Sequence, residues 1–487
     1  MRKTLQTAPA RSGALARTPL ASACAAFLLV GCSMMPVYER PPAPVAPQWP
    51  TLGGSLPVDA SANAAADLPW QAFVVDARLR TLIEQALADN RDLRVAALAI
   101  EQARAQHQIR AADLTPTLNL AATGNRQPTS GGGISSTYTA GLAMASWEID
   151  FFGRVASLKE AALAQYLATE EARRAVQTSL IAAVANAWLS LQANDELLAL
   201  AQRTLVTRED SQRLVRLRFD QGVSSALDLR QAESLVATAR VALAQQQRLR
   251  ALDVNALTLL TGQPMPAELL ESQGTSDPVF APVPEGLPSD LLVRRADVRQ
   301  AEQLLMAANA SIGAARAAFF PRIALTASAG TASNALSGLF KGGSWGWTLA
   351  PQALLPIFDA GRNQAGLDSV LAGRDMAVAQ YEKAIQTAFR EVSDALAGRA
   401  TLGDQWQAQQ AQAEAEADRF RLADLRYRNG VASSLEVLDA QRALFASQQA
   451  LVQTRLALRQ NQVLLYKALG GGWATAPQQA AAPARQD

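Results

Sequence analysis

Cysteine and histidine are almost absent from this sequence of 487 residues. The two cysteines, Cys24 and Cys32, both lie near the N-terminus, so the rest of the chain can form neither a disulfide nor a thiolate nucleophile. The single histidine, His107, lies in a polar stretch with helical periodicity, and we interpret it as an ordinary surface residue of a helix. Histidine-based metal sites and catalytic triads are therefore not expected.

Charge and long apolar runs are scarce as well. Only 18% of the residues are charged and the formal net charge is +2, whereas 49% are hydrophobic. This balance offers no electrostatic footprint for nucleic acid, so no nucleic-acid partner is expected. After the N-terminal segment no stretch approaches about eighteen consecutive apolar residues, and we predict no transmembrane helix.

Enzyme motifs are missing too. The sequence contains no P-loop, no nucleophile elbow and no HExxH pair, and its glycine runs at Gly131 and Gly470 lie outside a strand-to-helix context. The adjacent Glu170 and Glu171 lie on a charged helical face, where we expect them to be solvated. The sequence therefore predicts a protein that is not an enzyme, with no metal site and no cofactor.

Residues 1–31 have the pattern of a secretory signal, with basic residues followed by the apolar run PLASACAAFLLVG. The next residue completes LVGC, which resembles the lipobox of bacterial lipoproteins, whose cysteine receives S-diacylglycerol and an N-acyl chain such as palmitate. Cys24 lacks the preceding leucine and is the poorer candidate. We predict a lipid anchor at Cys32; the alternative is ordinary cleavage with an unmodified cysteine. Ser33 in the following position favours the outer membrane over the inner one.

Low-complexity segments frame the body of the chain. Residues 32–69 form a leader that includes PVYERPPAPVAPQWP, whose prolines exclude a helix and predict an extended path across another part of the protein. Residues 471–487 form a tail that we expect to be disordered.

The body of the chain contains an internal sequence repeat. SWEIDFFGR at 146–154 has a counterpart in LLPIFDAGR at 354–362, and RFDQGVSSALDL from Arg218 has one in RYRNGVASSLEVL from Arg426. The offset is about 205 in the first part of each repeat and 208 in the later part. Such self-similarity indicates two copies of one structural unit. We place the first repeat at 70–262, a Pro-rich linker at 263–296 and the second repeat at 297–470.

Each repeat is predicted to contain a helix, a pair of β-strands and a long helical hairpin. Residues 154–218 contain neither proline nor glycine, which allows roughly 95 Å of continuous helix. Apolar residues recur every seven positions, as in long helices packed in coiled-coil fashion: Val184, Leu191, Leu198 and Leu205; Leu229, Val236, Leu243 and Leu257, with Arg250 interrupting; and Val437, Leu444, Leu451, Leu458 and Leu465. The predicted strands are 115–125, 138–152, 320–330 and 344–358, and the hairpin tips are 219–226 and 427–434.

Four strands are too few to close a barrel. Open strand edges are not tolerated in lipid, and the smallest membrane barrels have about eight strands. Several copies of the chain must therefore share one barrel: two copies give eight strands and a filled interior, and three give twelve strands with room for a channel. The strand count alone leaves both possibilities open.

These features together resemble the TolC family, and most closely its lipid-anchored outer-membrane channels of resistance-nodulation-division (RND) multidrug efflux pumps. The resemblance rests on the doubled strand and helix pattern, the two tip sequences, PVYERP after the lipobox, and LPWQAFVVDARLRTLIEQALADNRDLRVA from Leu68. It implies a mostly α-helical homotrimer whose strands complete a twelve-stranded barrel in the outer membrane and whose long helices form a periplasmic α-barrel. The implied partners are outer-membrane lipid, a periplasmic adaptor and an inner-membrane RND pump.

The resemblance also assigns roles to individual positions. Tip residues would meet the adaptor, a periplasmic gate would lie near the second tip, and Gly153, Arg154, Gly361 and Arg362 would mark the strand-to-helix junctions. Three-fold symmetry would bring three Asp439 carboxylates into a ring that attracts cations; the alternative is a solvated heptad position. The implied tip residues are Gly222, Val223, Ser224, Gly430, Val431 and Ala432, and the implied gate residues are Tyr427, Leu435, Glu436 and Asp439.

The favoured interpretation is a passive duct that exports drugs or other small toxic compounds and is energised by the inner-membrane partner. One alternative keeps this architecture but assigns it to type I protein secretion or heavy-metal efflux. A second alternative is a periplasmic coiled-coil scaffold without a pore, which explains the heptads but not four alternating strands.

Overall fold

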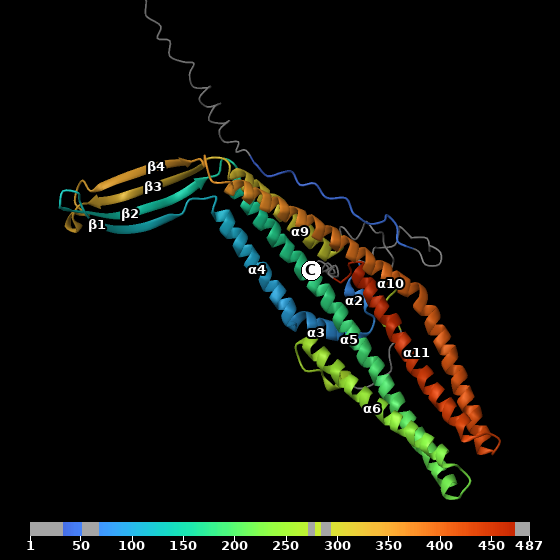
Figure 1. The fold of residues 1–487 in the computed structure, drawn as a ribbon. Helices are drawn as coiled ribbons and strands as arrows, with labels where there is room; N and C mark the ends of the chain where they lie inside the picture. Colours follow the sequence, from blue (N-terminus) through green and yellow to red (C-terminus); the bar gives the residue numbers. More distant parts are fainter. Residues whose placement is uncertain (1–32, 51–67, 271–277, 284–293, 473–487) are drawn as a thin grey trace, which may run out of the picture. The chain divides into compact units, whose positions relative to one another are not determined.

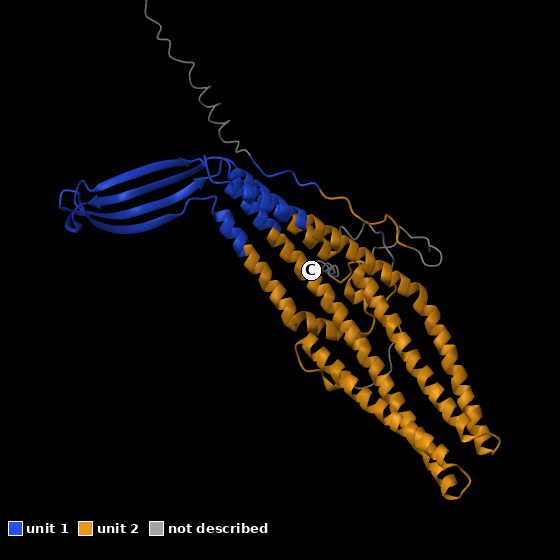
Figure 2. Ribbon diagram, viewed as in Figure 1, with its two compact units in different colours: residues 1–39, 105–164, 306–376 blue, residues 40–104, 165–305, 377–487 orange. Residues whose placement is uncertain are grey.

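The computed structural model describes residues 33–50, 68–270, 278–283 and 294–472. The signal peptide, Cys32 and almost all of the predicted tail lie outside these residues. The chain divides into two compact units (Figure 2). Unit 1 comprises residues 1–39, 105–164 and 306–376, and unit 2 comprises residues 40–104, 165–305 and 377–487.

Unit 1 contains one antiparallel sheet with the order β1-β2-β3-β4 (Figure 1). The central pair, β2 with β3, joins the two sequence repeats, and β1 and β4 are the edges. All four strands are present, but their ends differ from the prediction by up to four residues. They are β1 (Leu118–Pro128), β2 (Ile134–Ile149), β3 (Arg322–Ser333) and β4 (Trp345–Leu354).

Prolines account for three of these differences. Pro116 and Pro321 precede β1 and β3, which therefore begin later than predicted, and β4 ends before Pro356 instead of continuing to residue 358. Proline has no N–H to donate to a strand ladder. Pro351 lies within β4, an edge strand of the sheet in a single chain, where proline occurs more often than in central strands.

A pair of glycines faces across the seam between β2 and β3. Gly141 is in register with Gly330, and a Cβ built on Gly141 would lie 2.5 Å from the Gly330 Cα. The converse Cβ would lie 2.6 Å from the Gly141 Cα. The strands approach so closely here that neither position has room for a side chain.

Long helices dominate the chain and confirm the mostly α-helical prediction. The two longest, α5 and α10, have 67 residues each. Among the described residues, no helix is both long and apolar enough to cross a membrane. The helices are α2 (Trp70–Phe73), α3 (Ala77–Asp89), α4 (Arg91–Ala112), α5 (Arg154–Asp220), α6 (Ala226–Thr261), α7 (Ala267–Leu270), α9 (Ala296–Ala317), α10 (Arg362–Arg428) and α11 (Ser434–Ala468).

The seven-residue pattern marks the packed faces of these helices. Val184, Leu191 and Leu257 are almost completely buried, and every other apolar residue of the three predicted series is buried or half-buried. Arg250, which interrupts one series, donates from Nε to Asp195 Oδ1 at 2.5 Å and from Nη2 to the Leu270 carbonyl at 2.9 Å. The coiled-coil interpretation of the heptads agrees with this burial.

The two repeats close their hairpins in the same way within unit 2. Asn90 Nδ2 donates to the Leu260 carbonyl at 2.9 Å, and Arg295 Nη1 makes the corresponding contact with the Ala468 carbonyl at 3.1 Å. Each hairpin then ends in a glycine with positive φ, and Gly262 packs against the backbone just before α4 as Gly470 packs against the backbone just before α9. A neutral amide in one repeat is therefore replaced by a guanidinium in the other.

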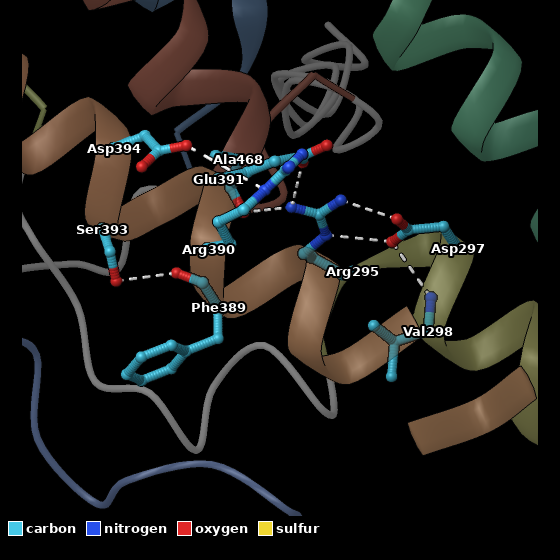
Figure 3. Close-up of polar contacts among 9 residues, drawn as sticks. All are labelled: Arg295, Asp297, Val298, Phe389, Arg390, Glu391, Ser393, Asp394 and Ala468. Carbon is cyan, nitrogen blue, oxygen red and sulfur yellow. Dashed lines mark hydrogen bonds and ion pairs between the residues drawn. The ribbon is translucent and has the colours of Figure 1, made fainter. Parts of the chain in front are cut away.

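Arg295 is the centre of a polar cluster (Figure 3). Its side chain is 6% exposed and donates to both carboxylate oxygens of Asp297, at 2.9 and 2.6 Å, and to Glu391 at 2.8 Å. Burial raises the pKa of Asp297, but the hydrogen bonds and charge of Arg295 lower it further, so that it lies below its ordinary value. The cluster fastens the start of α9 to the middle of α10 and the end of α11.

The prediction that Glu170 and Glu171 are solvated is wrong for both residues. Glu171 is buried, accepts a hydrogen bond from Arg174 and forms an ion pair with Arg299, each at 2.7 Å, so it links α5 to α9. The half-buried Glu170 accepts from the Tyr166 hydroxyl at 2.5 Å. The contribution of Arg299 could not be seen from charge spacing along α5, because it comes from another helix.

Candidate functional site at the helix tips

The first tip is a five-residue connection between α5 and α6. Gly222 has φ +73°, and the Val223 amide donates to the Arg218 carbonyl at 2.9 Å, which closes the end of the helix. Ser225 and Asp228 then cap α6 reciprocally, each side chain accepting from the other residue's backbone. These contacts make the tip a defined structure that presents Val223 to solvent, with 74% of the residue exposed.

The second tip repeats this geometry between α10 and α11. Gly430 has φ +75°, the Val431 amide donates to the Arg426 carbonyl at 3.0 Å, and Val431 is 69% exposed. A helix that reverses within few residues needs a positive φ, and glycine supplies it at both tips. Ser433, unlike Ser225, makes no side-chain capping bond to the described residues.

Two contacts connect the tips to each other. Ser434 Oγ donates to Asp228 Oδ1 at 2.7 Å, and the Arg218 guanidinium carbon lies 4.3 Å from the centre of the Tyr427 ring. The bond from Ser434, followed by those from Ser225 and Ser224, lowers the pKa of Asp228. The first tip is therefore joined to the second by one charge-assisted hydrogen bond and one cation–π contact.

The four predicted gate residues have different surroundings. Tyr427 is 7% exposed and packs against Ala423, Val437 and Ala440, so its ring supports the hairpin instead of projecting from it. Leu435 is 56% exposed. Glu436 lies 3.6 Å from Arg426 across the hairpin. Glu436 and Leu435 thus remain on the surface, whereas Tyr427 does not.

Asp439 is not the bare carboxylate that the cation-ring prediction assumed. It accepts from Arg419 Nη2 at 2.5 Å and from Arg442 Nη2. The bonds from these two arginines, Arg419 first, lower the pKa of Asp439. Sequence reasoning missed Arg419 because it lies 20 residues earlier, on the opposite helix of the hairpin. Only the register of α10 against α11 would have identified it.

The strand-to-helix junctions share a positive φ at glycine but differ at arginine. Gly153 and Gly361 have φ +69° and +82°. Arg154 donates to both oxygens of Glu148, each at 2.7 Å, and Arg322 lies 2.5 Å from the same carboxylate. Arg362 is exposed to solvent. The first junction is thus an ion-pair cluster, and the corresponding arginine of the second faces water.

An aspartate also caps each of the two long helices, which the sequence analysis did not identify. Asp150 Oδ2 accepts from the Ala156 amide at 2.7 Å, and Asp359 accepts from the Gly361 and Asn363 amides at 3.0 and 2.9 Å. The signal was present as an aspartate shortly before each Gly-Arg pair. Within the described part of the chain, no three histidine, cysteine or acidic residues gather as a metal site.

Comparison with known proteins gives a consistent result. Residues 82–263 and 287–471 match the family described as "Outer membrane efflux protein". The chain is 49% identical over 466 residues to the toluene efflux pump outer membrane protein TtgC of Pseudomonas putida, covering 94% of this chain and 96% of that protein.

Solved structures agree with this sequence match. The crystal structure of a membrane protein from Pseudomonas aeruginosa has a TM-score of 0.84 and 46% identity, covering 91% of this chain and 98% of that one. The open state of the Neisseria gonorrhoeae MtrE outer membrane channel has a TM-score of 0.81 and 40% identity, covering 91% and 99%. The chain therefore belongs to the outer membrane efflux protein family, a family of channels with the TolC-like fold and not of enzymes.

Proposed function

We propose that the protein is the exit duct of a tripartite efflux pump, through which drugs, solvents or other small toxic compounds leave the cell. The observation that carries this proposal is a four-stranded sheet with two unpaired edges in a chain whose remaining bulk is two long helical hairpins. The similarity to TtgC, named for toluene efflux, supports small apolar molecules as cargo. The protein itself performs no catalysis, and the inner-membrane partner supplies the energy.

The assembly we propose is a homotrimer in the outer membrane. The edge strands β1 and β4 carry exposed apolar side chains, among them Leu118, Leu120, Trp345 and Trp347. Pairing β4 of one copy with β1 of the next closes the edges, as lipid requires. Three copies give twelve strands, which leave a lumen wide enough for conduction, whereas eight strands are filled by their own side chains.

The two hairpin tips are the proposed docking points for a periplasmic adaptor, which connects the duct to an RND-type pump. Val223 and Val431 are exposed in equivalent positions, each next to a glycine and followed by a small residue, Ser224 or Ala432. An apolar side chain held on a rigid turn is a suitable anchor for a helical hairpin of a partner. The gate lies beside these points, at Leu435, Glu436 and Asp439, with Tyr427 packed beneath them.

The oligomer and the cargo can be tested together. Detergent-purified protein is expected to have the mass of a trimer by multi-angle light scattering and to dissociate on heating. In cells that lack their own duct, co-expression with an adaptor and RND pump is expected to restore resistance to solvents and hydrophobic drugs. A monomer, or restored secretion of a protein or resistance to a heavy metal without drug resistance, would contradict the proposal and favour its alternatives.

The anchor is proposed to be acylated Cys32. Replacing Cys32 with serine is expected to abolish incorporation of labelled palmitate. Chains of this variant that have not yet formed a barrel should also be extractable from membranes without detergent. A single acyl chain binds a membrane only reversibly, whereas several chains on one residue anchor it stably. Cys24→Ser is the matched control and should incorporate label like the unmodified protein. Label retained in the Cys32 variant would place the lipid elsewhere.

A further inference from the structure

The strand register assigns each side chain of the sheet to one of two faces, because cross-strand partners share a face. The other face is polar, and on it the hydroxyl oxygens of Thr123 and Thr139 lie 2.6 Å apart and those of Ser328 and Thr348 lie 2.7 Å apart. A membrane barrel turns its apolar face to lipid and its polar face to the interior. The apolar face carries the exposed residues Leu118, Leu120, Leu142, Trp345, Trp347 and Leu349.

Charge is rare on the interior face. Within the four strands that the structure describes, the charged side chains assigned to this face by the register are Glu148 of β2 and Arg322 of β3. Both lie at the end of the sheet where β2 leads into α5 (Figure 1). Any charge selectivity that the strands give to the barrel interior must therefore arise at this end.

A β-bulge places Glu148 on the interior face. Between Met144 and Trp147, strand β2 has one residue more than the facing part of β3. Ser146, inside the bulge, has φ +47°, and its amide donates to Thr326 Oγ1 at 3.3 Å. One extra residue reverses the facing of every side chain that follows it. Without the bulge, Glu148 would face lipid and Trp147 would face the interior.

Glu148 is shared by two arginines. Arg154 donates to both of its carboxylate oxygens at 2.7 Å, and Arg322 Nε lies 2.5 Å from Oε2. One carboxylate and two guanidiniums give this cluster a formal charge of +1. The side chain of Glu148 is 10% exposed, that of Arg154 33% and that of Arg322 60%. The surplus positive charge is therefore most accessible to water at Arg322.

The second repeat does not build such a cluster. Leu354 stands in the position that corresponds to Ser146, and Pro356 in the position that corresponds to Glu148. Strand β4 pairs with β3 without a register shift as far as Leu354, so it has no bulge. Each chain therefore contributes one cluster of this kind, and a trimer contributes three.

We propose that Glu148, Arg154 and Arg322 of three copies form a charged collar inside the duct, at the level where the barrel meets the helices, and that Glu148 sets its charge selectivity. This inference rests on the trimeric duct proposed above. The carboxylate balances one of the two arginines and leaves one positive charge in each chain. Three such charges around a water-filled lumen attract anions and repel cations. The collar therefore favours the passage of anionic and neutral compounds over cationic ones.

The ratio of chloride to potassium permeability tests the collar. It is obtained from the reversal potential of the purified full-length protein in a planar bilayer, in a KCl gradient near 10 mM, where the screening length is about 30 Å. Glu148→Gln raises the cluster charge by one unit and is expected to raise the ratio by about two-fold or more. Arg322→Gln lowers the charge by one unit and should lower the ratio by a similar factor. Arg154 still pairs with Glu148 in this second variant, so its buried carboxylate keeps a partner.

The double variant Glu148→Gln/Arg322→Gln is the matched control, because it restores the original cluster charge and should restore the original ratio. In 1 M KCl, where the screening length is about 3 Å, the differences among the variants should disappear. A ratio that does not change in Arg322→Gln, or differences that persist in 1 M KCl, would overturn the collar.

Failure of the proposed duct gives a different result. The unmodified protein would then be a monomer by light scattering or would form no channels. Trimeric channels whose permeability ratio is independent of the cluster charge would leave the duct intact and contradict the collar alone.

Discussion

Replacing Arg295 with methionine is expected to destabilise the helical part of the protein by about 2–4 kcal/mol. The change keeps the apolar stem but removes the group that satisfies Asp297, Glu391 and the Ala468 carbonyl together. Loss of one partner from a fully buried ion pair costs about 3–5 kcal/mol. The expected value lies lower because the side chains of Asp297 and Glu391 are 42% and 27% exposed, and water partly screens them.

Thermal unfolding followed by circular dichroism measures this effect, with an expected fall of about 2–4 °C in the apparent midpoint of a chain of this length. Arg390→Met is the matched control, because that arginine lies next to Glu391, is 72% exposed and, among the residues that the structure describes, pairs with Asp394 alone, at 4.0 Å (Figure 3). It should shift the midpoint by less than about 1 °C, as surface pairs do. Equal shifts in the two variants would show that the Arg295 cluster does not stabilise the hairpin ends.

The Arg295 cluster should make the stability of the folded protein depend on pH. The folded-state pKa of Asp297 is below its ordinary value, so its contribution to stability is present above the unfolded pKa of about 3.9 and is lost as the pH falls through the lower folded value. Acidification from pH 5 to pH 3 should therefore reduce the stability difference between the unmodified protein and the Arg295→Met variant.

Replacing Asp439 with asparagine is expected to raise single-channel conductance in a planar bilayer by about two-fold or more, since charge and side-chain packing at a constriction set its permeability. The substitution weakens the bonds from Arg419 of α10 and Arg442 of α11, which hold the hairpin next to its second tip. Arg419→Gln should have the same direction and a smaller effect, because Arg442 still contacts the carboxylate.

The protonation of Asp439 gives this second prediction an independent readout. Because Arg419 and Arg442 lower its pKa, the ionised Asp439 should stabilise the second hairpin at all pH values above about 3.9, and this stabilisation should be lost only as the pH falls through the lower folded pKa. Conductance should thus be constant between pH 7 and pH 5. Asp418→Asn is the control, because Asp418 is 74% exposed and pairs with Arg421 on its own helix. Unchanged conductance in the Asp439 variant would show that Asp439 is an ordinary solvated heptad position with no part in a gate.

The parts of the fold that follow from local patterns were predictable. Heptads identify the helices because a single periodicity persists over many turns, and the glycines of the tips stand out because reversal requires positive φ. The four strands were found as well, although Pro116, Pro321 and Pro356 moved their ends. The repeat itself supplied much of this information, because each ambiguous segment could be compared with its counterpart in the other repeat.

The contacts of the candidate site could not be derived in the same way. Arg419, Arg299 and Arg295 bind carboxylates that lie on other helices, and Arg40 binds one 262 residues away. A charge pattern along one helix contains no information about its neighbour. The same limit explains why Glu171 was expected in water and Asp439 without partners.

The glycine pair of the central seam has a consequence for how such a duplicated chain can change over time. Gly141 and Gly330 occupy opposite halves, yet each excludes a side chain on the other. A methyl group on either glycine would push β2 and β3 apart, so neither position can accept a larger residue by itself. Proteins that descend from the same duplication should therefore retain both glycines, even where the rest of the two copies has diverged.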